Sequence, residues 1–424
     1  MAIYLDHAAT TPMTPEVIAA YASALGVAGN PSSIHSQGQA ARRMLEDARH
    51  TIAASLGADP VEVTFTSGGT EAINLALKGL WWSRNPAGRV AADGGVPAGR
   101  VAADGGVPAG RVAADGGVPA GRVAADGGVS RPRILSTRAE HHATIDALEW
   151  LEQHEGAVID WIPVDDRGRI DLDALDAALA DDVALVTTLW ANNEVGTVQP
   201  VREIVARAEA YGVPVHVDAV SAFGSVDITF SETGAAALSV SAHKVGGPVG
   251  VGALLIARGA SVTPLLHGGN QQRSRSGTMD AAGAHAFAVA ARAADVARRE
   301  HTTELVALRD HLVTELRSAV PEAILRGDPI DRLPGNAHFT FPGCEGDSLL
   351  FLLDAAGFSV STGSACQAGV PEASHVLLAM GVSEQDARGA LRFSLGHGTT
   401  RAEVDALLAA LPAVVARARA AGLS

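Results

Sequence analysis

The sequence contains few cysteines and few aromatic residues. Among its 424 residues there are two cysteines, Cys344 and Cys366, and aromatic side chains make up 4% of the chain. Two cysteines in a chain of this length do not form a disulfide framework, which excludes the small disulfide-stabilised folds. The length is instead sufficient for two or three domains and a large hydrophobic core.

The sequence also lacks an excess of positive charge and any long apolar run. Its net charge of -15 argues against a nucleic-acid surface as the main site, so we expect no direct nucleic-acid partner. No run of 18 apolar residues is present, and no membrane span is expected. Residues 1–6 show no basic region followed by an apolar one, which predicts a cytoplasmic protein.

Residues 86–129 consist of four identical copies of an 11-residue unit, Pro-Ala-Gly-Arg-Val-Ala-Ala-Asp-Gly-Gly-Val. Each unit has three glycines, one proline and only two valines to bury. We predict a flexible insertion, because so little apolar surface cannot offset the entropy of ordering the backbone. A solenoid is the alternative, but this unit is short and poor in apolar residues.

Outside the repeat, short apolar stretches alternate with amphipathic ones. This order predicts an α/β domain with a mostly parallel sheet and helices on both of its faces. The expected strands are 61–64, 133–136, 158–163, 183–189, 213–217 and 237–240, and the expected helices are 72–82, 144–153, 171–179 and 201–211. From residue 266 onward the pattern predicts a smaller α+β domain, with a long helix over 281–320 that is broken once at most.

Several reactive residue types directly follow the expected strands. Parallel strands present their carboxyl ends at one edge of a sheet, and ligands of open α/β sheets bind there. The residues that share this position are the glycine turn Thr66–Thr70, His141, Asn193, Asp218 and Lys244. The glycine turn precedes a helix, which is the geometry of an anion site. The shared position predicts one site that all five segments form.

Lys244 lies in a tight turn, Ser241-Ala242-His243-Lys244, between two apolar strands. Burial and a neighbouring cation both lower the pKa of a lysine. An amine with a lowered pKa can condense with an aldehyde. A surface lysine in a hairpin is the other interpretation of this short stretch taken alone.

With these residues in place, the chain resembles the cysteine desulfurases, which use pyridoxal phosphate (PLP) and have the fold of class V aminotransferases. The resemblance spans almost the whole chain, except for the repeat. It is carried by 4–11 (Tyr-Leu-Asp-His-Ala-Ala-Thr-Thr), 29–35 (Gly-Asn-Pro-Ser-Ser-Ile-His), 66–71 (Thr-Ser-Gly-Gly-Thr-Glu), 140–142 (Glu-His-His), 192–196 (Asn-Asn-Glu-Val-Gly), 217–219 (Val-Asp-Ala), 241–244 (Ser-Ala-His-Lys), 275–278 (Arg-Ser-Gly-Thr), 363–366 (Gly-Ser-Ala-Cys) and 391–396 (Leu-Arg-Phe-Ser-Leu-Gly).

The resemblance implies a role for each matching residue. Lys244 would hold PLP as a Schiff base, Asp218 would pair with the pyridine nitrogen, and His141 would stack on the ring and exchange protons. The phosphate would be held by Gly69, Thr70, Ser241 and His243, and by Thr278 of a partner subunit, which implies a homodimer. Asn193 would touch the ring hydroxyl or the substrate carboxylate, and Arg392 would bind that carboxylate as a fork. His142 is the competing candidate for the role of His141.

Cys366 matches the nucleophile of the long-loop type of this family. Its neighbours Ser364, Gln367 and Gly369 are not core residues, which counts against a buried structural cysteine. Cys344 fits no family motif, and we expect it to be structural. The chain departs from the family at Ser221, where glutamine is usual, and at Asn270 and Gln272 in the loop on the dimer side.

The resemblance implies a PLP-dependent transferase fold of the aspartate aminotransferase type. The large PLP-binding domain would cover 15–265, and the small domain 1–14 and 266–424. The implied activity converts L-cysteine to L-alanine and passes sulfur to an acceptor, an iron–sulfur scaffold or a tRNA-thiolating enzyme; no metal is implied. The alternatives are a selenocysteine lyase or another class V lyase or aminotransferase, and a non-catalytic adaptor on the same fold.

Overall fold

The computed structural model describes residues 2–86, 131–363 and 373–422. The repeat beyond Pro86 and the expected nucleophile Cys366 therefore lie outside the described residues. The prediction of a flexible insertion is not tested by the structure.

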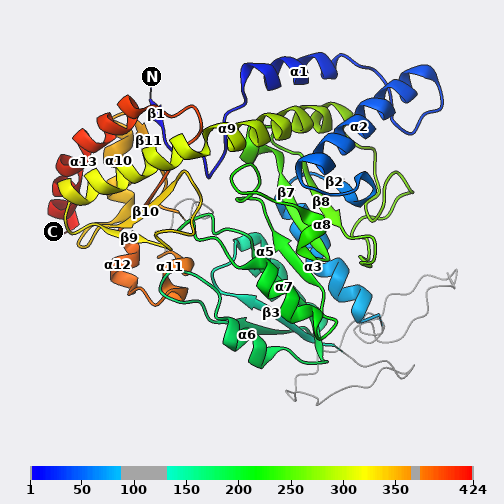
Figure 1. Ribbon diagram of the computed structural model, residues 1–424, viewed down its shortest axis with the longest axis horizontal. Helices are drawn as coiled ribbons and strands as arrows, with labels where there is room; N and C mark the ends of the chain where they lie inside the picture. The colour runs from blue at the N-terminus through cyan, green and yellow to red at the C-terminus, as the bar shows by residue number, and fades with distance from the viewer. Residues whose placement is uncertain (1, 87–130, 364–372, 423–424) are drawn as a thin grey trace, which may run out of the picture.

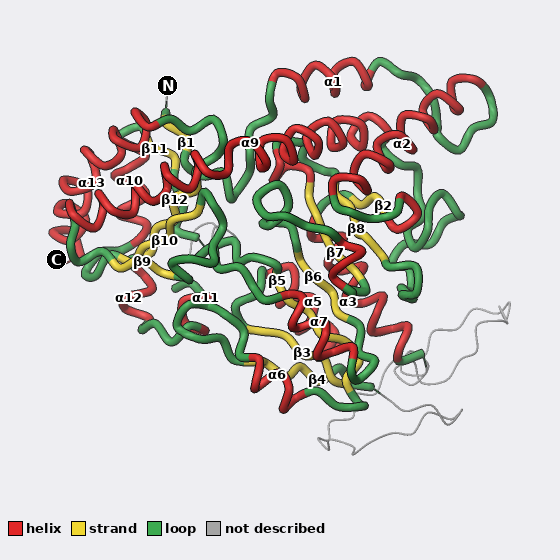
Figure 2. The backbone as a smooth tube through the Cα atoms, in the orientation of Figure 1, coloured by secondary structure: helices red, strands yellow, loops and turns green. Residues whose placement is uncertain are grey.

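The larger sheet has its strands in the order β2-β8-β7-β6-β5-β3-β4. Strand β8 is antiparallel to both of its neighbours, and the other pairings are parallel, so the predicted mostly parallel sheet is confirmed. Figure 2 shows these strands as one twisted sheet. The bounds are β2 Val63–Thr66, β3 Arg133–Thr137, β4 Val158–Ile162, β5 Val183–Leu189, β6 Val215–Asp218, β7 Ala237–Ser241 and β8 Gly252–Ile256. Every residue of β5 is buried, as its continuous apolar sequence predicts.

Helices cover both faces of this sheet. Apolar side chains of α3 and α5 form one core with the strands, and those of α1, α2, α7 and the first part of α9 form the other. The helices are α1 Pro15–Leu25, α2 Ser36–Ser55, α3 Gly69–Arg84, α5 His142–Glu155, α6 Leu172–Ala178, α7 Val201–Glu209 and α8 Phe230–Thr233.

A smaller sheet lies beside the large one. It is antiparallel, with the order β12-β10-β9, and β1 pairs with β11 next to it. A separate hydrophobic core joins this sheet to α10, α13 and the second part of α9. The bounds are β1 Ile3–Tyr4, β9 Ile324–Arg326, β10 Asn336–Thr340, β11 Phe358–Ser359, β12 Ala390–Ser394, α10 Gly346–Ala355, α11 His375–Ala379, α12 Glu384–Arg388 and α13 Arg401–Gly422.

Helix α9, Ala281–Ala319, connects the two cores (Figure 1). Its 39 residues form one continuous helix, so the break that the sequence analysis allowed for does not occur. Phe287 packs into the core of the large sheet, whereas Leu312 packs into the core of the small sheet. The proposed division of the chain at residues 14/15 and 265/266 remains a prediction.

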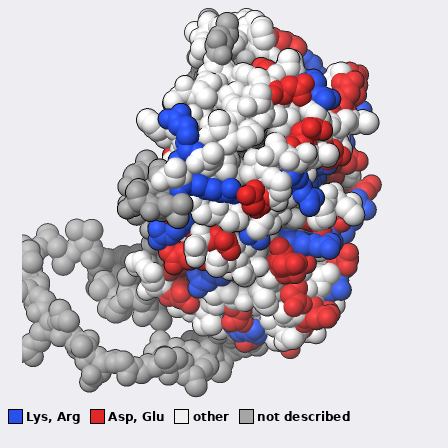
Figure 3. Space-filling model, turned by 90° about the vertical axis from the view of Figure 1, so that its left-hand side faces the viewer, with Lys and Arg blue, Asp and Glu red and all other residues white. Residues whose placement is uncertain are grey.

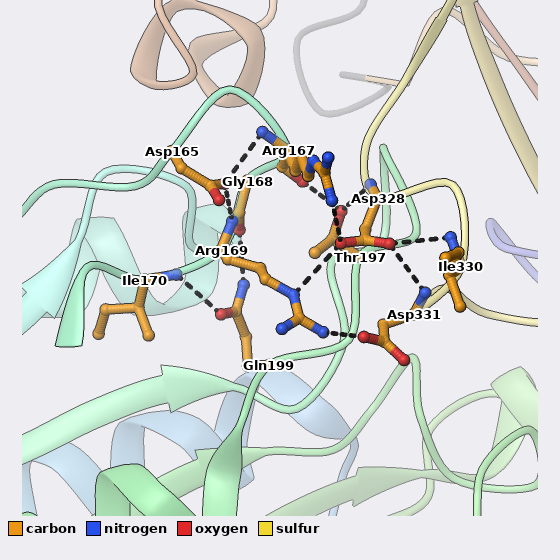
Figure 4. A network of polar contacts seen from close by, with 10 residues as sticks. All are labelled: Asp165, Arg167, Gly168, Arg169, Ile170, Thr197, Gln199, Asp328, Ile330 and Asp331. Atoms are coloured by element: carbon orange, nitrogen blue, oxygen red, sulfur yellow. Dashed lines mark hydrogen bonds and ion pairs between the residues drawn. The ribbon is translucent and has the colours of Figure 1, made fainter.

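A polar network also links the turn after β4 to the loop after β9 (Figure 4). Asp328 accepts hydrogen bonds from the backbone N–H groups of Ile330 and Asp331, at 2.8 and 2.9 Å. Its carboxylate lies 3.4 Å from Arg169 Nε and 3.7 Å from Arg167 Nη1. The network fixes the small sheet to the edge of the large one.

Acidic and basic side chains are interspersed on the face seen in Figure 3. No extended area of one sign is visible on that face. Among the described residues, no helix combines the length and the apolar character that crossing a membrane requires.

Candidate functional site

The expected site residues gather at one edge of the large sheet. Strands β2, β3, β5, β6 and β7 run in the same direction, and each ends at this edge. The segments that follow them carry the glycine turn, His141, Asn193, Asp218 and Lys244. The prediction that these five segments meet is confirmed, because the topology brings their strand ends together.

Lys244 follows β7 in a 3-10 turn, Ala242–Val245, that Gly246 closes in the left-handed conformation at φ 79°. Its Nζ donates to the backbone oxygens of Ala8 and Ala9, at 2.7 and 2.9 Å. The lysine therefore attaches the N-terminal segment of the chain to the strand ends.

Asp218 ends β6 and is 2% exposed. Burial raises the pKa of its carboxyl group to about 6, although the hydrogen bond from Val220 N–H and the charge of Lys244 both favour ionisation. The N–H of Val220 lies 2.9 Å from Oδ1. A buried carboxyl group of this kind would be stabilised as a carboxylate by a cation placed beside it.

His141 precedes α5 and caps its N-terminus. Its Nδ1 accepts from the N–H of Ala143 at 3.0 Å, so the neutral ring carries its proton on Nε2. Burial, with the charge of Lys244 as the next cause, lowers the pKa of His141 to about 4. The ring of His142 instead packs on His375, with centroids 4.5 Å apart. These contacts favour His141 as the histidine that faces Lys244.

The glycine turn forms a cradle at the N-terminus of α3. Gly69 is the first residue of α3, whose initial N–H groups lack partners within the helix. A Cβ on Gly69 would lie 2.9 Å from Val220, so the turn fits closely against the segment after β6. Beside it, Ser241 Oγ is buried and has no hydrogen-bond partner among the described residues. The cradle offers donors to an anion.

His243 and Thr278 complete the residues expected around that anion. Burial and the charge of Lys244 lower the pKa of His243 to about 4, and its Nδ1 lies 3.3 Å from Thr10 Oγ1. Thr278 is exposed, as a contact to a partner subunit requires. Thr70 is also exposed at the cradle.

Arg392 lies on β12 of the small sheet and is 3% exposed. Its Nη1 donates to the backbone oxygen of Asn193 at 2.9 Å, and its Nη2 to Asp6 Oδ1 at 2.8 Å. Its Nε is buried without a partner in the described chain. These bonds use two of the five N–H donors of the guanidinium, which is thus held in place with donors to spare for a ligand.

Sequence reasoning missed three side chains that shape the site. Asp6 orients Arg392 from 386 residues away, and buried Glu140 accepts from Leu189 N–H at 3.0 Å. Gln272 bonds through both amide atoms to the backbone of Phe65, at 3.0 and 2.7 Å, and so satisfies the outer edge of β2. Asp6 and Glu140 lie within the stretches that match the family, and this was the sequence signal that could have identified them.

Ser221, which stands where the family usually has glutamine, lines a cavity of about 130 Å³ together with Lys244 and Asn336. The short side chain leaves space beside the lysine. Cys344 is buried, and burial raises the pKa of its thiol. Its burial agrees with the structural role that we expected for it.

The comparisons with known proteins agree with this geometry. A family model for class-V aminotransferases matches residues 3–92 and 128–407. An "IscS-like cysteine desulfurase" of Mycobacterium tuberculosis is 47% identical over 426 residues, covering 99% of this chain and 98% of the relative. A "Cysteine desulfurase" of Cereibacter sphaeroides is 40% identical and covers 99% of this chain and 97% of the relative.

Solved structures give the same result. A "NifS-like protein" superposes with a TM-score of 0.82 at 31% identity, covering 98% of this chain and 100% of that one. A "NifS-like protein" from Rickettsia africae has a TM-score of 0.79 at 27% identity and covers 98% and 99% of the two chains. The interval that the family model leaves unmatched lies inside the 11-residue repeat.

Proposed function

The chain belongs to the cysteine desulfurases of the class-V aminotransferase family, and we propose that it moves the sulfur of L-cysteine to Cys366 and releases L-alanine. The observation that carries this proposal is the meeting of Lys244, Asp218 and His141 at one sheet edge, opposite Arg392 of the small sheet. Amine, buried acid, neutral imidazole and guanidinium are the groups that this reaction needs.

The described residues fit PLP. Ser241 Oγ is buried and has no partner within the described part of the chain; it lies at the N-terminus of α3, where a phosphate would be held with Gly69, Thr70 and His243. Asp218, at the end of the neighbouring strand, would hold a protonated ring nitrogen. When bound, PLP supplies an electron sink for bonds broken at the substrate's α-carbon.

The chain's own residues bind the substrate and move its protons. Lys244 Nζ would take the proton from the α-carbon of cysteine, because it is a flexible amine among strand ends. His141, neutral with its proton on Nε2, would exchange a proton near the substrate sulfur. Arg392 would bind the carboxylate in a geometry that Asp6 has already fixed, and Asn193 would contact the carboxylate or the ring hydroxyl.

The sulfur step balances without an added oxidant or reductant. The thiolate of Cys366 attacks the sulfur of cysteine, a sulfur–sulfur bond forms, and the carbon–sulfur bond breaks. The electron pair of that bond remains on the carbon, which takes up a proton. One thiol and one cysteine thus become one persulfide and one alanine.

The proposal includes partners that the single chain does not contain. Thr278 is exposed and would reach the phosphate of a second subunit, so we propose a homodimer. The persulfide would pass to an acceptor protein, an iron–sulfur scaffold or a tRNA-thiolating enzyme, in the cytoplasm. Measuring the stability of the complex that this protein forms with each candidate acceptor would distinguish the two acceptors.

A direct assay tests the function. The purified protein should contain PLP with an absorbance band that Lys244→Ala alters, and it should release alanine from cysteine. Faster release from selenocysteine than from cysteine would instead favour the selenocysteine lyase. A protein that binds no PLP and releases no alanine would favour the non-catalytic adaptor and overturn the proposal.

A further inference from the structure

The loop after β5 carries a buried carboxylate that no step above uses. Glu194 is 2% exposed. Its N–H donates to Asn192 Oδ1 at 2.8 Å, and its carbonyl accepts from Asn336 Nδ2 at 2.9 Å. Arg332 adds a bond to the carbonyl of the next residue, Val195, at 2.8 Å. The backbone of Glu194 is therefore held from both sides, by its own loop and by the small sheet.

The carboxylate of Glu194 accepts a hydrogen bond from Ser374 and lies close to Gly363. Ser374 Oγ donates to Oε2, and the same hydroxyl accepts from Leu377 N–H at 3.2 Å as the N-cap of α11. On the other side, a Cβ added to Gly363 would lie 3.1 Å from Oε2 and 3.3 Å from His338 Nε2. Gly363 adopts φ 96°, where side chains other than that of glycine are strained.

Gly363 and Ala373 are the described residues that border the segment containing Cys366, and Ser374 directly follows Ala373. The residue before Glu194, Asn193, holds Arg392 through its carbonyl. A single loop therefore binds Ser374, lies close to Gly363 and holds the arginine proposed to bind the substrate carboxylate. The positions of these groups relative to one another must be fixed if a thiolate is to meet the substrate sulfur in line.

We infer that Glu194 is a positioning residue for the sulfur step, fixing Gly363 and Ser374 relative to Arg392. The inference rests on the proposed function, since it takes Cys366 as the nucleophile. Glu194 touches neither the substrate nor the cofactor in this role. Its loss should slow persulfide formation and leave the binding of cysteine intact.

The test uses the holoenzyme and separates these two events. The absorbance change that cysteine produces in the bound cofactor reports binding, and persulfide per active site in a single turnover reports the sulfur step. Glu194→Ala should keep the absorbance change at the same cysteine concentration and slow persulfide formation by about 10- to 100-fold, the scale of a displacement of about 1 Å. Glu194→Gln, which still accepts from Ser374, should lose less.

Ser374→Ala provides a second variant that leaves Glu194 in place, and it serves if Glu194→Ala does not fold. The double variant should be about as slow as the slower single variant, because the two groups act as a unit. Glu203→Ala, an exposed change on α7, is the matched control and should behave as the wild type.

Three results would overturn the inference. Wild-type rates of persulfide formation in Glu194→Ala would do so, as would a parallel loss of cysteine binding, or single-variant losses that multiply in the double variant. A wild-type holoenzyme that forms no persulfide would instead refute the proposed function itself, before any variant is compared.

Discussion

The carboxyl group of Asp218 is buried at the end of β6. Its pKa is raised from 3.8 to about 6 by burial, so the folded protein without cofactor binds this proton more tightly than the unfolded chain does. The stability of the cofactor-free protein is therefore lowered as the pH rises from about 4 to about 6, and it stays lowered above that range.

We expect Asp218→Asn to stabilise the cofactor-free protein above pH 6 by about 2 to 3 kcal/mol, and to have little effect below about pH 4. Asparagine keeps the acceptor for Val220 N–H, so the change removes the ionisation and little else. Urea unfolding across this pH range measures the effect. The same variant should lose affinity for PLP; a cofactor-free variant less stable than the wild type at pH 8 would contradict the account.

Arg392 gives a prediction about binding. Arg392→Lys replaces a fork with a point charge, so the KM for cysteine should rise on the order of 10- to 100-fold while the cofactor stays bound. Steady-state kinetics with Arg401→Lys as the exposed control would measure it. An unchanged KM would remove Arg392 from the substrate site.

The residues of the site differ in how far the sequence could predict them. Lys244, Asp218 and His141 follow apolar strands, and a parallel sheet brings such positions together, so the pattern was sufficient. The pairing of Asp6 with Arg392 depends on the residues after β1 meeting β12 across 386 residues, which no local pattern encodes. The contact of Glu194 with Ser374 spans 180 residues and was missed for the same reason.

At the scale of the elements, most expected helices and strands are present, with shifted ends. The strand expected from Val61 begins at Val63, because Pro60–Glu62 form a 3-10 turn. The strand expected from Val213 begins at Val215, since Pro214 has no N–H for the ladder. Helix α13 begins with a capping box, in which Thr400 N–H bonds to Glu403 at 2.7 Å and Glu403 N–H bonds to Thr400 Oγ1 at 3.3 Å.

The network of Figure 4 gives a prediction at this scale. Burial alone would raise the pKa of Asp328, but the N–H groups of Ile330 and Asp331 and the two arginines hold it below 3.8. A carboxyl group with a lowered pKa stabilises the fold above its unfolded pKa, and this stability is lost as the pH falls through the folded value.

Asp328→Asn should therefore lower the free energy of unfolding at pH 7 by about 1 to 3 kcal/mol. The gap to the wild type should narrow as the pH falls below about 4 and through the lowered pKa of the wild-type carboxyl group. Asp331→Asn, whose side chain is 58% exposed, is the control and should cost much less. Equal losses in the two variants at pH 7 would show that burial of Asp328 is not what matters.

At the scale of the whole molecule, the repeat leaves the fold and returns to it at one place. The side chain of Asn85 donates to the carbonyl of Arg131 at 2.9 Å and accepts from its N–H at 3.0 Å. This place is the far end of α3, away from the glycine turn at its start. The order of the elements in the sequence predicts this exit from the far end of α3, and the bonds between Asn85 and Arg131 show how the fold accommodates the insertion.

Deletion of 86–129, joining Asn85 to Ser130, should keep PLP, dimerisation and turnover. Asn85 and Arg131 would then be two residues apart, the spacing at which an asparagine side chain bonds the backbone in an Asx turn. The melting temperature should change little, because loop length costs roughly 0.6 kcal/mol per doubling. A large loss of turnover or stability would mean that the repeat packs on the protein or its partner subunit. Loss of sulfur transfer alone would point to a docking role for the repeat.

The central claim is that sulfur passes through Cys366. Mass spectrometry of peptides after one turnover with cysteine tests it most directly, in the wild type, Cys366→Ser and Cys344→Ser. We predict one added sulfur atom on the Cys366 peptide in the wild type and in Cys344→Ser, and none in Cys366→Ser, which should still bind PLP and cysteine. Added sulfur on Cys344, or wild-type sulfur release by Cys366→Ser, would contradict the account.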